Sequence, residues 1–245
     1  MQNNSSDEMI EHLKQVARAM NVDVTEAQAA LFGQYCNFLL EYNQKVNLTR
    51  ITEPREVAVK HFGDSFAVLA PKKLPLGSSV ADVGTGAGFP GIPVAIMRSD
   101  LQLTLVDSLR KRTVFLSELV QLLGLQNVKV VWARAEELGH NPAYREKFDV
   151  VMARAVASLN VLTELCLPLT KPGGLFLAMK GPKAAEELRL AKGAIAKLGG
   201  FLISAETQSL PLVGETRTLI TIGKKHATAA FYPRKAGIPE RQPLS

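Results

Sequence analysis

The chain has 245 residues, 47% of them hydrophobic and 21% charged, which suffices for a full core and excludes a disordered protein. No apolar run reaches the roughly 18 residues of a membrane-spanning helix, and the polar N-terminus shows no secretory signal. The two cysteines, Cys36 and Cys166, lie far apart in apolar segments, which indicates neither a disulfide framework nor a metal site. We therefore expect a cytoplasmic protein without a metal.

The formal net charge is +6, and the excess of basic residues is unevenly distributed. Residues 1–79 have a balance of −1, residues 80–222 a balance of +3, and residues 223–245 a balance of +4. The C-terminal segment also carries Phe231 and Tyr232 beside Arg234 and Lys235. Basic side chains next to aromatic ones suit a polyanion with bases that stack, so the tail favours a nucleic-acid partner. A solubilising tail is the alternative.

The first 70 residues have the spacing of helices. Apolar residues recur at helical intervals over 9–20 and again over 27–42, where Thr25 and Gln28 form a candidate capping box. Pro54 suits the first turn of a third helix that runs toward Leu69. The turn-rich stretch 71–79 then predicts a boundary, so we expect a helical extension over 1–75 and a second domain over 76–245.

From Val80 onward, short apolar runs alternate with helical stretches. Expected strands cover 80–83, 102–106, 128–132, 148–152 and 175–179, with closing strands over 201–209 and 217–222. Expected helices cover 110–123, 158–167 and 183–198, and Pro172-Gly173-Gly174 predicts a turn. This alternation predicts an α/β fold with a mostly parallel sheet, covered on both faces and ending in an antiparallel strand.

A glycine-rich loop, DVGTGAGFPG over 82–91, follows the first expected strand. Its glycines allow a sharp turn and the close approach of a ligand to the backbone. Gly86, Gly88 and Gly91 match the dinucleotide-binding pattern, and Asp107 ends the next strand 21 residues after Gly86, where an acid binds a ribose hydroxyl. Either a nicotinamide-dependent oxidoreductase or a methyltransferase using S-adenosylmethionine would use such an arrangement.

Two features favour the methyltransferase. Asp82 precedes the first glycine, where its carboxylate would repel a pyrophosphate but suits a cationic sulfonium. Pro90 and Pro93 flank the helix start, which does not fit a helix mouth devoted to phosphate. Tyr144 and Lys147 are spaced i,i+3, so the chain also lacks the i,i+4 pair expected for hydride transfer.

The chain resembles the bacterial small-subunit (16S) ribosomal RNA guanine-N7 methyltransferases, also called glucose-inhibited division protein B. The resemblance runs from about Tyr42 to Leu244, and the segments DSLRKR, ARAVASL and YPRKAG together make it specific. The matching segments are YNQKVNLT (42–49), HFGDS (61–65), DVGTGAGFPGIP (82–93), VDSLRKR (106–112), RAEE (134–137), ARAVASL (153–159), MKG (179–181) and YPRKAGIP (232–239).

The resemblance implies a Rossmann-like class I methyltransferase fold with a seven-stranded, mostly parallel sheet and an N-terminal helical extension. It also implies S-adenosylmethionine as cofactor and S-adenosylhomocysteine as product. Asp107 would bind the ribose and Ala135 with Glu136 the adenine, while Arg154 would line the site as cofactor contact and candidate catalytic residue. The full set of implied cofactor contacts is Gly84, Gly86, Phe89, Asp107, Ala135, Glu136 and Arg154.

Guanine N7 carries a lone pair at neutral pH, so no base has to remove a proton, and we expect catalysis chiefly by positioning. Small-subunit ribosomal RNA or a ribosomal particle would be the partner, and we expect a monomer that does not bind membranes. Candidate RNA contacts are Arg110, Lys111, Arg112, Lys180, Arg234 and Lys235. Methylation of another RNA or of a small molecule, and a non-catalytic RNA-binding module, are the further alternatives.

Overall fold

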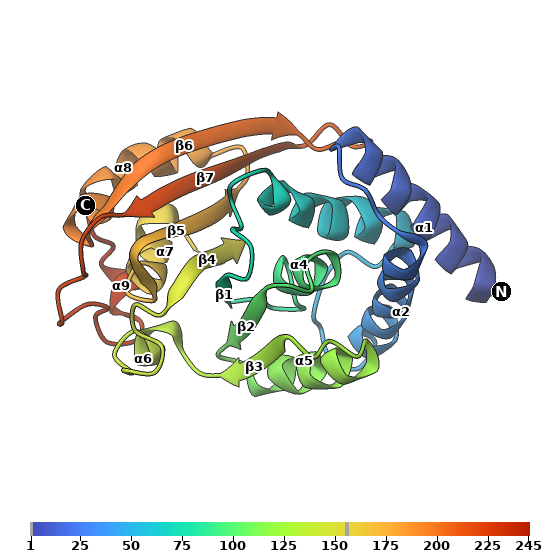
Figure 1. Ribbon diagram of the computed structural model, residues 1–245, viewed down its shortest axis with the longest axis horizontal. Coiled ribbons are helices and arrows are strands. Elements are labelled where there is room, and N and C mark those ends of the chain that lie inside the picture. Colours follow the sequence, from blue (N-terminus) through green and yellow to red (C-terminus); the bar gives the residue numbers. More distant parts are fainter. Residues whose placement is uncertain (1, 155–156) are drawn as a thin grey trace.

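The structure, a computed structural model, describes residues 2–154 and 157–245, with side chains from Asp7 onward (Figure 1). Within these residues the strands form one seven-stranded sheet in the order β3-β2-β1-β4-β5-β7-β6. The strands are β1 Ser79–Val83, β2 Gln102–Asp107, β3 Val128–Trp132, β4 Phe148–Arg154, β5 Thr170–Lys180, β6 Gly200–Ser209 and β7 Thr216–Lys224. Only β7 runs antiparallel to its neighbours, β5 and β6.

All seven strands expected from the sequence are present, but β5 corrects one expectation. Residues 172–174 were expected to form a turn, whereas the structure places them inside β5, which begins at Thr170. The pairing of β4 with β5 shifts register between Phe148 and Val150, and Gly173 takes a φ of +86°. Glycine tolerates that conformation without strain, so the irregularity lies inside the strand and does not end it.

Both faces of the central strands β1 and β4 are buried, as expected for parallel strands joined by helices, whereas the edge strand β6 is largely exposed. Successive residues of β4 alternate between the two faces, so Val150 and Met152 join one hydrophobic cluster while Val151 and Ala153 join another. Helices α4 (Gly91–Met97) and α5 (Arg110–Leu122) lie on one side. Helices α6 (Ala135–Leu138), α7 (Leu159–Cys166) and α8 (Ala184–Lys197) lie on the other (Figure 1).

The N-terminal helices are α1 (Gln2–Ala19) and α2 (Glu26–Asn43). The expected capping box is confirmed, because the Thr25 side chain accepts from the Gln28 amide and the Gln28 side chain accepts from the Thr25 amide. The third helix starts at Pro54 as expected, but it is irregular and not one α-helix. It consists of α3 (Pro54–Glu56), the π-helical η1 (Val57–Gly63) and the 3-10 helix η2 (Phe66–Leu69).

One hydrophobic cluster joins the N-terminal helices to the sheet domain. Phe32 and Tyr35 of α2 and Phe62 of η1 are fully buried together with Ile92 of α4 and Phe115 of α5. Figure 1 shows α1 and α2 beside α4 and α5, at the end of the molecule opposite α8. The helical extension therefore covers one side of the sheet domain and shares its core.

The C-terminal segment packs on the opposite side. Tyr232 and Leu244 are buried in the cluster beneath α7 and α8, and a short helix α9 (Ile238–Arg241) lies between them. The Arg145 guanidinium donates to the carbonyl oxygens of Thr228 and Tyr232 at 2.6 and 2.7 Å. These contacts make the basic tail an integral part of the fold.

The strand order reverses between β1 and β4. In open α/β sheets this switch point opens a crevice at the carboxyl ends of the strands, where ligands bind. The glycine-rich loop follows β1, Asp107 ends β2, and Arg154 ends β4. The fold therefore brings the three sequence features to one edge of the sheet.

Candidate functional site

The glycine-rich loop after β1 is held in place by Asp82. The Asp82 Oδ2 atom accepts from the Thr85 hydroxyl at 2.7 Å and from the Gly91 amide at 2.8 Å. Burial raises the pKa of Asp82 to about 6, although these two hydrogen bonds oppose the shift. Asp82 is fully buried, so its carboxylate fixes the two ends of the loop from beneath.

Helix α2 pins the middle of the same loop. The Tyr35 hydroxyl donates to the Ala87 carbonyl at 2.5 Å. Gly88 takes a φ of +102°, and a Cβ there would lie 2.7 Å from the Tyr35 hydroxyl and 2.8 Å from Ile92. Only glycine fits this position, so the loop conformation depends on the N-terminal helices as well as on its own sequence.

Asp107 faces the loop from the end of β2. Its Oδ2 atom accepts from the Gly86 amide at 3.0 Å, and its Oδ1 atom accepts from the Leu109 amide at 2.9 Å. Arg112 pairs with the same carboxylate at 3.3 Å. A carboxylate has about four lone-pair sites, so Asp107 retains acceptor capacity for a ligand hydroxyl.

Two hollows meet at Gly84 and Asp107. A cavity of about 390 Å³ is lined by Leu48, Thr49, His61, Gly84, Thr85, Gly86, Ala87, Phe89, Asp107, Ser108, Arg112 and Arg154. A smaller hollow of about 90 Å³ continues between β2, β3 and α6, and its lining includes Ala135, Glu136 and Glu240. All seven residues that the resemblance implies for cofactor binding thus line one of the two adjoining hollows.

A stack of side chains forms one wall of the larger cavity. The His61 ring lies face to face with Phe89 at a centroid distance of 4.3 Å, and the Arg154 guanidinium lies 4.8 Å from the Phe89 ring centre. Arg154 donates to Asp64 at 3.1 Å, to the Lys60 carbonyl at 3.2 Å and to His61 Nδ1 at 3.2 Å. Arg154 and Asp64 therefore form an ion pair that is largely shielded from solvent.

His61 is held as the neutral ring. Arginine can only donate, so His61 Nδ1 accepts from Arg154, and Nε2 carries the proton toward the Thr49 hydroxyl at 2.8 Å. Burial, followed by the Arg154 charge, lowers the pKa of His61 to about 3. His61 and Arg154 also line a second cavity on the far side of this wall.

The cluster at the start of α5 divides into two parts. Arg110 and Lys111 are exposed, and the Arg110 guanidinium lies 5.3 Å from the Trp132 ring centre. Arg112 instead lines the larger cavity beside Asp107, and its buried Nε atom has no hydrogen-bond partner among the described residues. The Arg112 side chain is 32% exposed, and a partly exposed guanidinium at the cavity wall suits a ligand carboxylate.

Two other expected RNA contacts, Lys180 and Arg234, have ion-pair partners within the fold. Lys180 is 7% exposed and pairs with Glu187 at 2.7 Å. Arg234 pairs with the fully buried Glu164 through Nε and a terminal nitrogen, at 2.8 and 2.6 Å. The desolvated carboxylate needs this cation, so Arg234 supports the fold. Lys235 is exposed.

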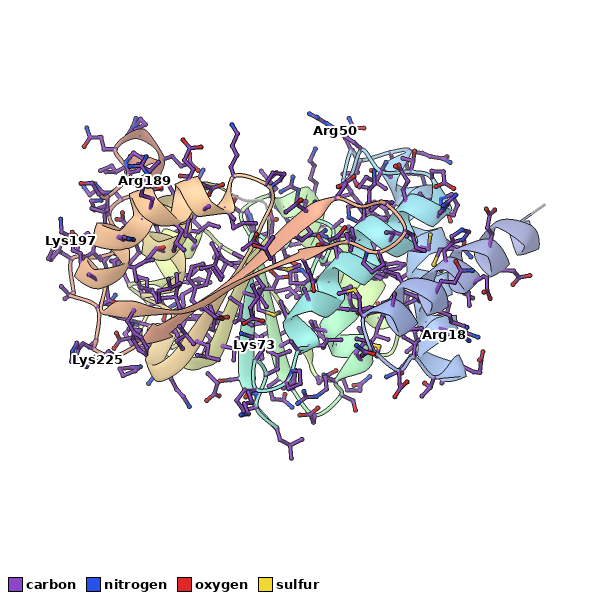
Figure 2. All side chains as sticks on the ribbon, turned by 90° about the horizontal axis from the view of Figure 1, so that it is seen from above. Arg18, Arg50, Lys73, Arg189, Lys197 and Lys225 are labelled. Atoms are coloured by element: carbon purple, nitrogen blue, oxygen red, sulfur yellow. The ribbon has the colours of Figure 1, made fainter. Side chains whose placement is uncertain are left out.

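Other basic side chains lie at both ends of the molecule. In Figure 2, Arg18 and Arg50 lie toward the N-terminal helices, and Arg189, Lys197 and Lys225 lie at the other end. Lys73 lies between them and donates to Glu206 at 2.7 Å. Basic side chains therefore lie along the whole length of the molecule, although most of the net excess belongs to residues 223–245.

Several site residues escape motif reasoning. Thr49, His61 and Asp64 fall in the matching segments 42–49 and 61–65, which was a signal of importance but not of role. Tyr35 and Glu240 carry no motif at all. Within the matching segment 153–159, residues 155 and 156 lie outside the described part of the chain.

The fold and the site together define a class I methyltransferase that depends on S-adenosylmethionine. Similar solved structures agree at the level of the fold. A putative sarcosine dimethylglycine methyltransferase from Galdieria sulphuraria is 12% identical and superposes with a TM-score of 0.53 over 71% of this chain and 88% of its own. YcgJ from Bacillus subtilis is 14% identical, with a TM-score of 0.51 over 68% of this chain and 100% of its own.

The family follows from sequence comparison. The sequence model of the family rRNA small subunit methyltransferase G matches residues 28–216 of this chain. A protein named ribosomal RNA small subunit methyltransferase G from Desulforamulus reducens is 48% identical over 95% of this chain and 97% of its own length. A protein of the same name from Lactobacillus delbrueckii subsp. bulgaricus is 50% identical over 91% and 95%. The chain belongs to this family, which supports the methyltransferase over the nicotinamide-dependent oxidoreductase.

Proposed function

We propose that the protein transfers the methyl group of S-adenosylmethionine to N7 of one guanine in small-subunit (16S) ribosomal RNA. The observation that carries this proposal is the position of the His61–Phe89–Arg154 wall. It separates the loop cavity beside Asp107 from a second cavity of about 420 Å³. A methyl transfer needs one site for the donor and one for the acceptor, side by side. The family supplies the ribosomal RNA.

The residues present fit the cofactor. When bound, S-adenosylmethionine supplies a methyl group on a cationic sulfonium. Asp107 would hold the ribose hydroxyls, and Ala135 with Glu136 would hold the adenine in the smaller hollow. Gly86 takes a φ of +63°, and a Cβ there would meet nothing closer than 4.0 Å, so its backbone is open to the ligand. Arg112 lines the loop cavity, and its guanidinium suits the amino-acid carboxylate.

Methyl transfer to guanine N7 requires these residues to position the reactants and does not require them to transfer a proton. Guanine N7 already carries its lone pair, so no general base is required. His61 would be the nearest candidate for a base, but its Nδ1 lone pair is taken by Arg154 and its Nε2 proton by Thr49. We infer that Arg154 orients the two reactants at the shared wall and excludes water from it.

Arg110 and Lys111 are the best-placed candidates for RNA backbone contacts. Both are exposed beside Ser108 and Arg112, which line the loop cavity. We expect the double variant Arg110→Ala, Lys111→Ala to bind RNA more weakly, and with less dependence on salt, than the matched control Arg189→Ala, Lys197→Ala on α8. Each lost phosphate contact should reduce the magnitude of the slope of log affinity against log salt by about 0.7 to 0.9. Equal slopes would remove Arg110 and Lys111 from the interface, and Lys235 would be tested next.

The assay that tests the function is transfer of labelled methyl from S-adenosylmethionine to small-subunit ribosomal RNA, naked or in particles, followed by mapping of the modified base. Modification at one guanine N7 is expected. Cofactor binding without transfer to any assembly state would refute the proposal, and label on a different base would favour the alternative of another RNA substrate.

We further propose that the protein is a cytoplasmic monomer that acts on the RNA without binding membranes. Its helical extension would cover residues 1–75 and its methyltransferase domain residues 76–245. No helix among the described residues is long and apolar enough to cross a bilayer.

A further inference from the structure

The second cavity, beyond the His61–Phe89–Arg154 wall, is lined by none of the expected cofactor contacts other than Arg154. It is lined by Ile51, Lys60, His61, Asp64, Arg154, Met179, Lys180, Gly181, Glu215 and Arg217. Its volume of about 420 Å³ lies in the range of small-ligand sites. Ile51 and Met179 give it apolar surface, and the other side chains are ionisable, so it suits a flat, polar ring with a hydrogen-bonding edge.

The charges of this cavity are arranged in a chain. Arg154 pairs with Asp64 at 3.1 Å, and Arg217 pairs with Asp64 at 3.2 Å and with Glu215 at 2.8 Å. Lys60 pairs with Glu215 at 3.0 Å. Hydrogen bonds from Arg217 and Lys60 lower the pKa of Glu215, so its carboxylate is ionised at neutral pH.

The two carboxylates differ in access. The Asp64 side chain is 6% exposed, and Glu215 is 40% exposed. Asp64 fixes Arg154 and Arg217, whereas Glu215 has surface left for a ligand. An ionised carboxylate offers acceptors only, so Glu215 can accept from a base that carries two neighbouring donors.

We propose that the second cavity receives the target guanine, with its N7 edge toward the His61–Arg154 wall and its N1–H and exocyclic amine toward Glu215. This inference rests on the proposed function and deepens it by naming a specificity residue. Guanine presents a ring N–H beside an amine, whereas adenine presents an acceptor at N1, which a carboxylate repels. Enzymes that act on an extruded base commonly read this Watson–Crick edge. Arg154 at the opposite wall can donate to O6, next to the reacting N7.

A phosphate in this cavity is the competing explanation, and the charges argue against it. Lys60 and Arg217 both contact Glu215, and Lys180 is paired with Glu187. Lys60 also pairs with Glu56, and Asp64 serves both Arg154 and Arg217, so the four cations of the cavity have four carboxylate partners. A phosphate would therefore meet the Glu215 carboxylate and cations whose charges are already balanced. A neutral base with donors on one edge does not meet this repulsion.

The test combines a change in the RNA with a change in the protein. Inosine lacks the exocyclic amine of guanosine but keeps N7, O6 and N1–H. Small-subunit ribosomal RNA is prepared by ligation with inosine at the mapped target position, and kcat/KM for methyl transfer is compared with that for guanosine RNA. We expect the wild-type protein to prefer guanosine by about tenfold, the effect of one hydrogen bond to a charged group.

The variants then assign this preference. Glu215→Ala should bring the guanosine-to-inosine ratio close to one, and Glu215→Gln, which keeps one acceptor, should give an intermediate ratio. Glu206→Ala is the matched control, because Glu206 lies on β6, pairs with Lys73 and does not line the cavity. Binding of S-adenosylhomocysteine checks that each variant is folded.

Two results would overturn the inference. One is equal use of both RNAs by the wild-type protein, and the other is a wild-type ratio in Glu215→Ala. Absence of methylation on guanosine RNA by the wild-type protein would instead overturn the proposed function, and the inference with it.

Discussion

His61 should make the stability of the protein fall as the pH is lowered below neutrality. Its ring is buried against Phe89 and accepts a hydrogen bond from Arg154, so a second ring proton has no place in the folded state. The pKa of His61 is about 3 in the folded protein and 6.5 in the unfolded chain. The unfolded chain therefore takes up a proton in the window from pH 6.5 down to about 3, and the folded state does not.

The magnitude follows from the two pKa values. Because the folded-state pKa is depressed, the stability is fully present above pH 6.5 and is lost as the pH falls toward the folded-state value. Each unit in this window costs about 1.4 kcal/mol, so between pH 7 and pH 5 the free energy of unfolding should lose about 2 kcal/mol to His61. Urea denaturation at the two pH values measures the difference.

Asp82 acts in the opposite direction. Burial raises its pKa to about 6, so its contribution is largest below the unfolded value of 3.8 and is lost as the pH rises through 6. Between pH 7 and pH 5 the protonation of Asp82 therefore adds roughly 1 kcal/mol to the free energy of unfolding. The wild-type protein alone therefore does not reveal the His61 effect, and a variant is needed.

His61→Gln removes the titration and leaves Asp82 in place. The variant should lose less stability between pH 7 and pH 5 than the wild-type protein, by about 2 kcal/mol. His226→Gln, at an exposed histidine, is the matched control and should behave as the wild type. The reasoning is refuted if His61→Gln and wild type show the same pH difference, or if NMR titration of the His61 ring gives a pKa near 6.5.

Three further substitutions test the other parts of the site. Asp107→Ala should weaken S-adenosylhomocysteine binding by about tenfold to a hundredfold in calorimetry, since a charged acceptor is lost; unchanged affinity would reject its ribose role. Arg234→Met leaves Glu164 buried without its cation and should cost about 3 kcal/mol in urea denaturation, whereas Lys235→Met should cost less than about 0.5; equal costs would contradict the structural role of Arg234. Arg154→Met removes one of the two cations of Asp64 and should cost less than Arg234→Met in the same assay, because Arg217 stays 3.2 Å from Asp64; an equal cost would mean that Arg217 does not compensate the Asp64 charge.

Local patterns in the sequence were enough to predict the seven strands and the glycine-rich loop, although not where β5 begins. Alternating short apolar runs predicted the strands, because a buried strand must fill both faces of a parallel sheet. The glycines of 84–91 and Asp107 lie within 24 residues of each other, at the ends of two consecutive strands. Neighbouring parallel strands bring such ends together, so the spacing alone places the loop beside the carboxylate. Thr25 and Gln28 marked the start of α2 for the same local reason.

The tertiary structure alone decided which charges are free and which are paired. Arg154 and His61 are 93 residues apart in sequence, and Arg234 and Glu164 are 70 apart, yet each pair is in contact. A basic side chain adds the same +1 to the net charge whether it faces RNA or a buried carboxylate. Its role depends on its burial and on its neighbours in space, which composition does not contain. For this reason the sequence identified the basic tail, and only the folded chain showed that Arg234 belongs to the core and that Lys60, Glu215 and Arg217 form a second cavity beside the cofactor site.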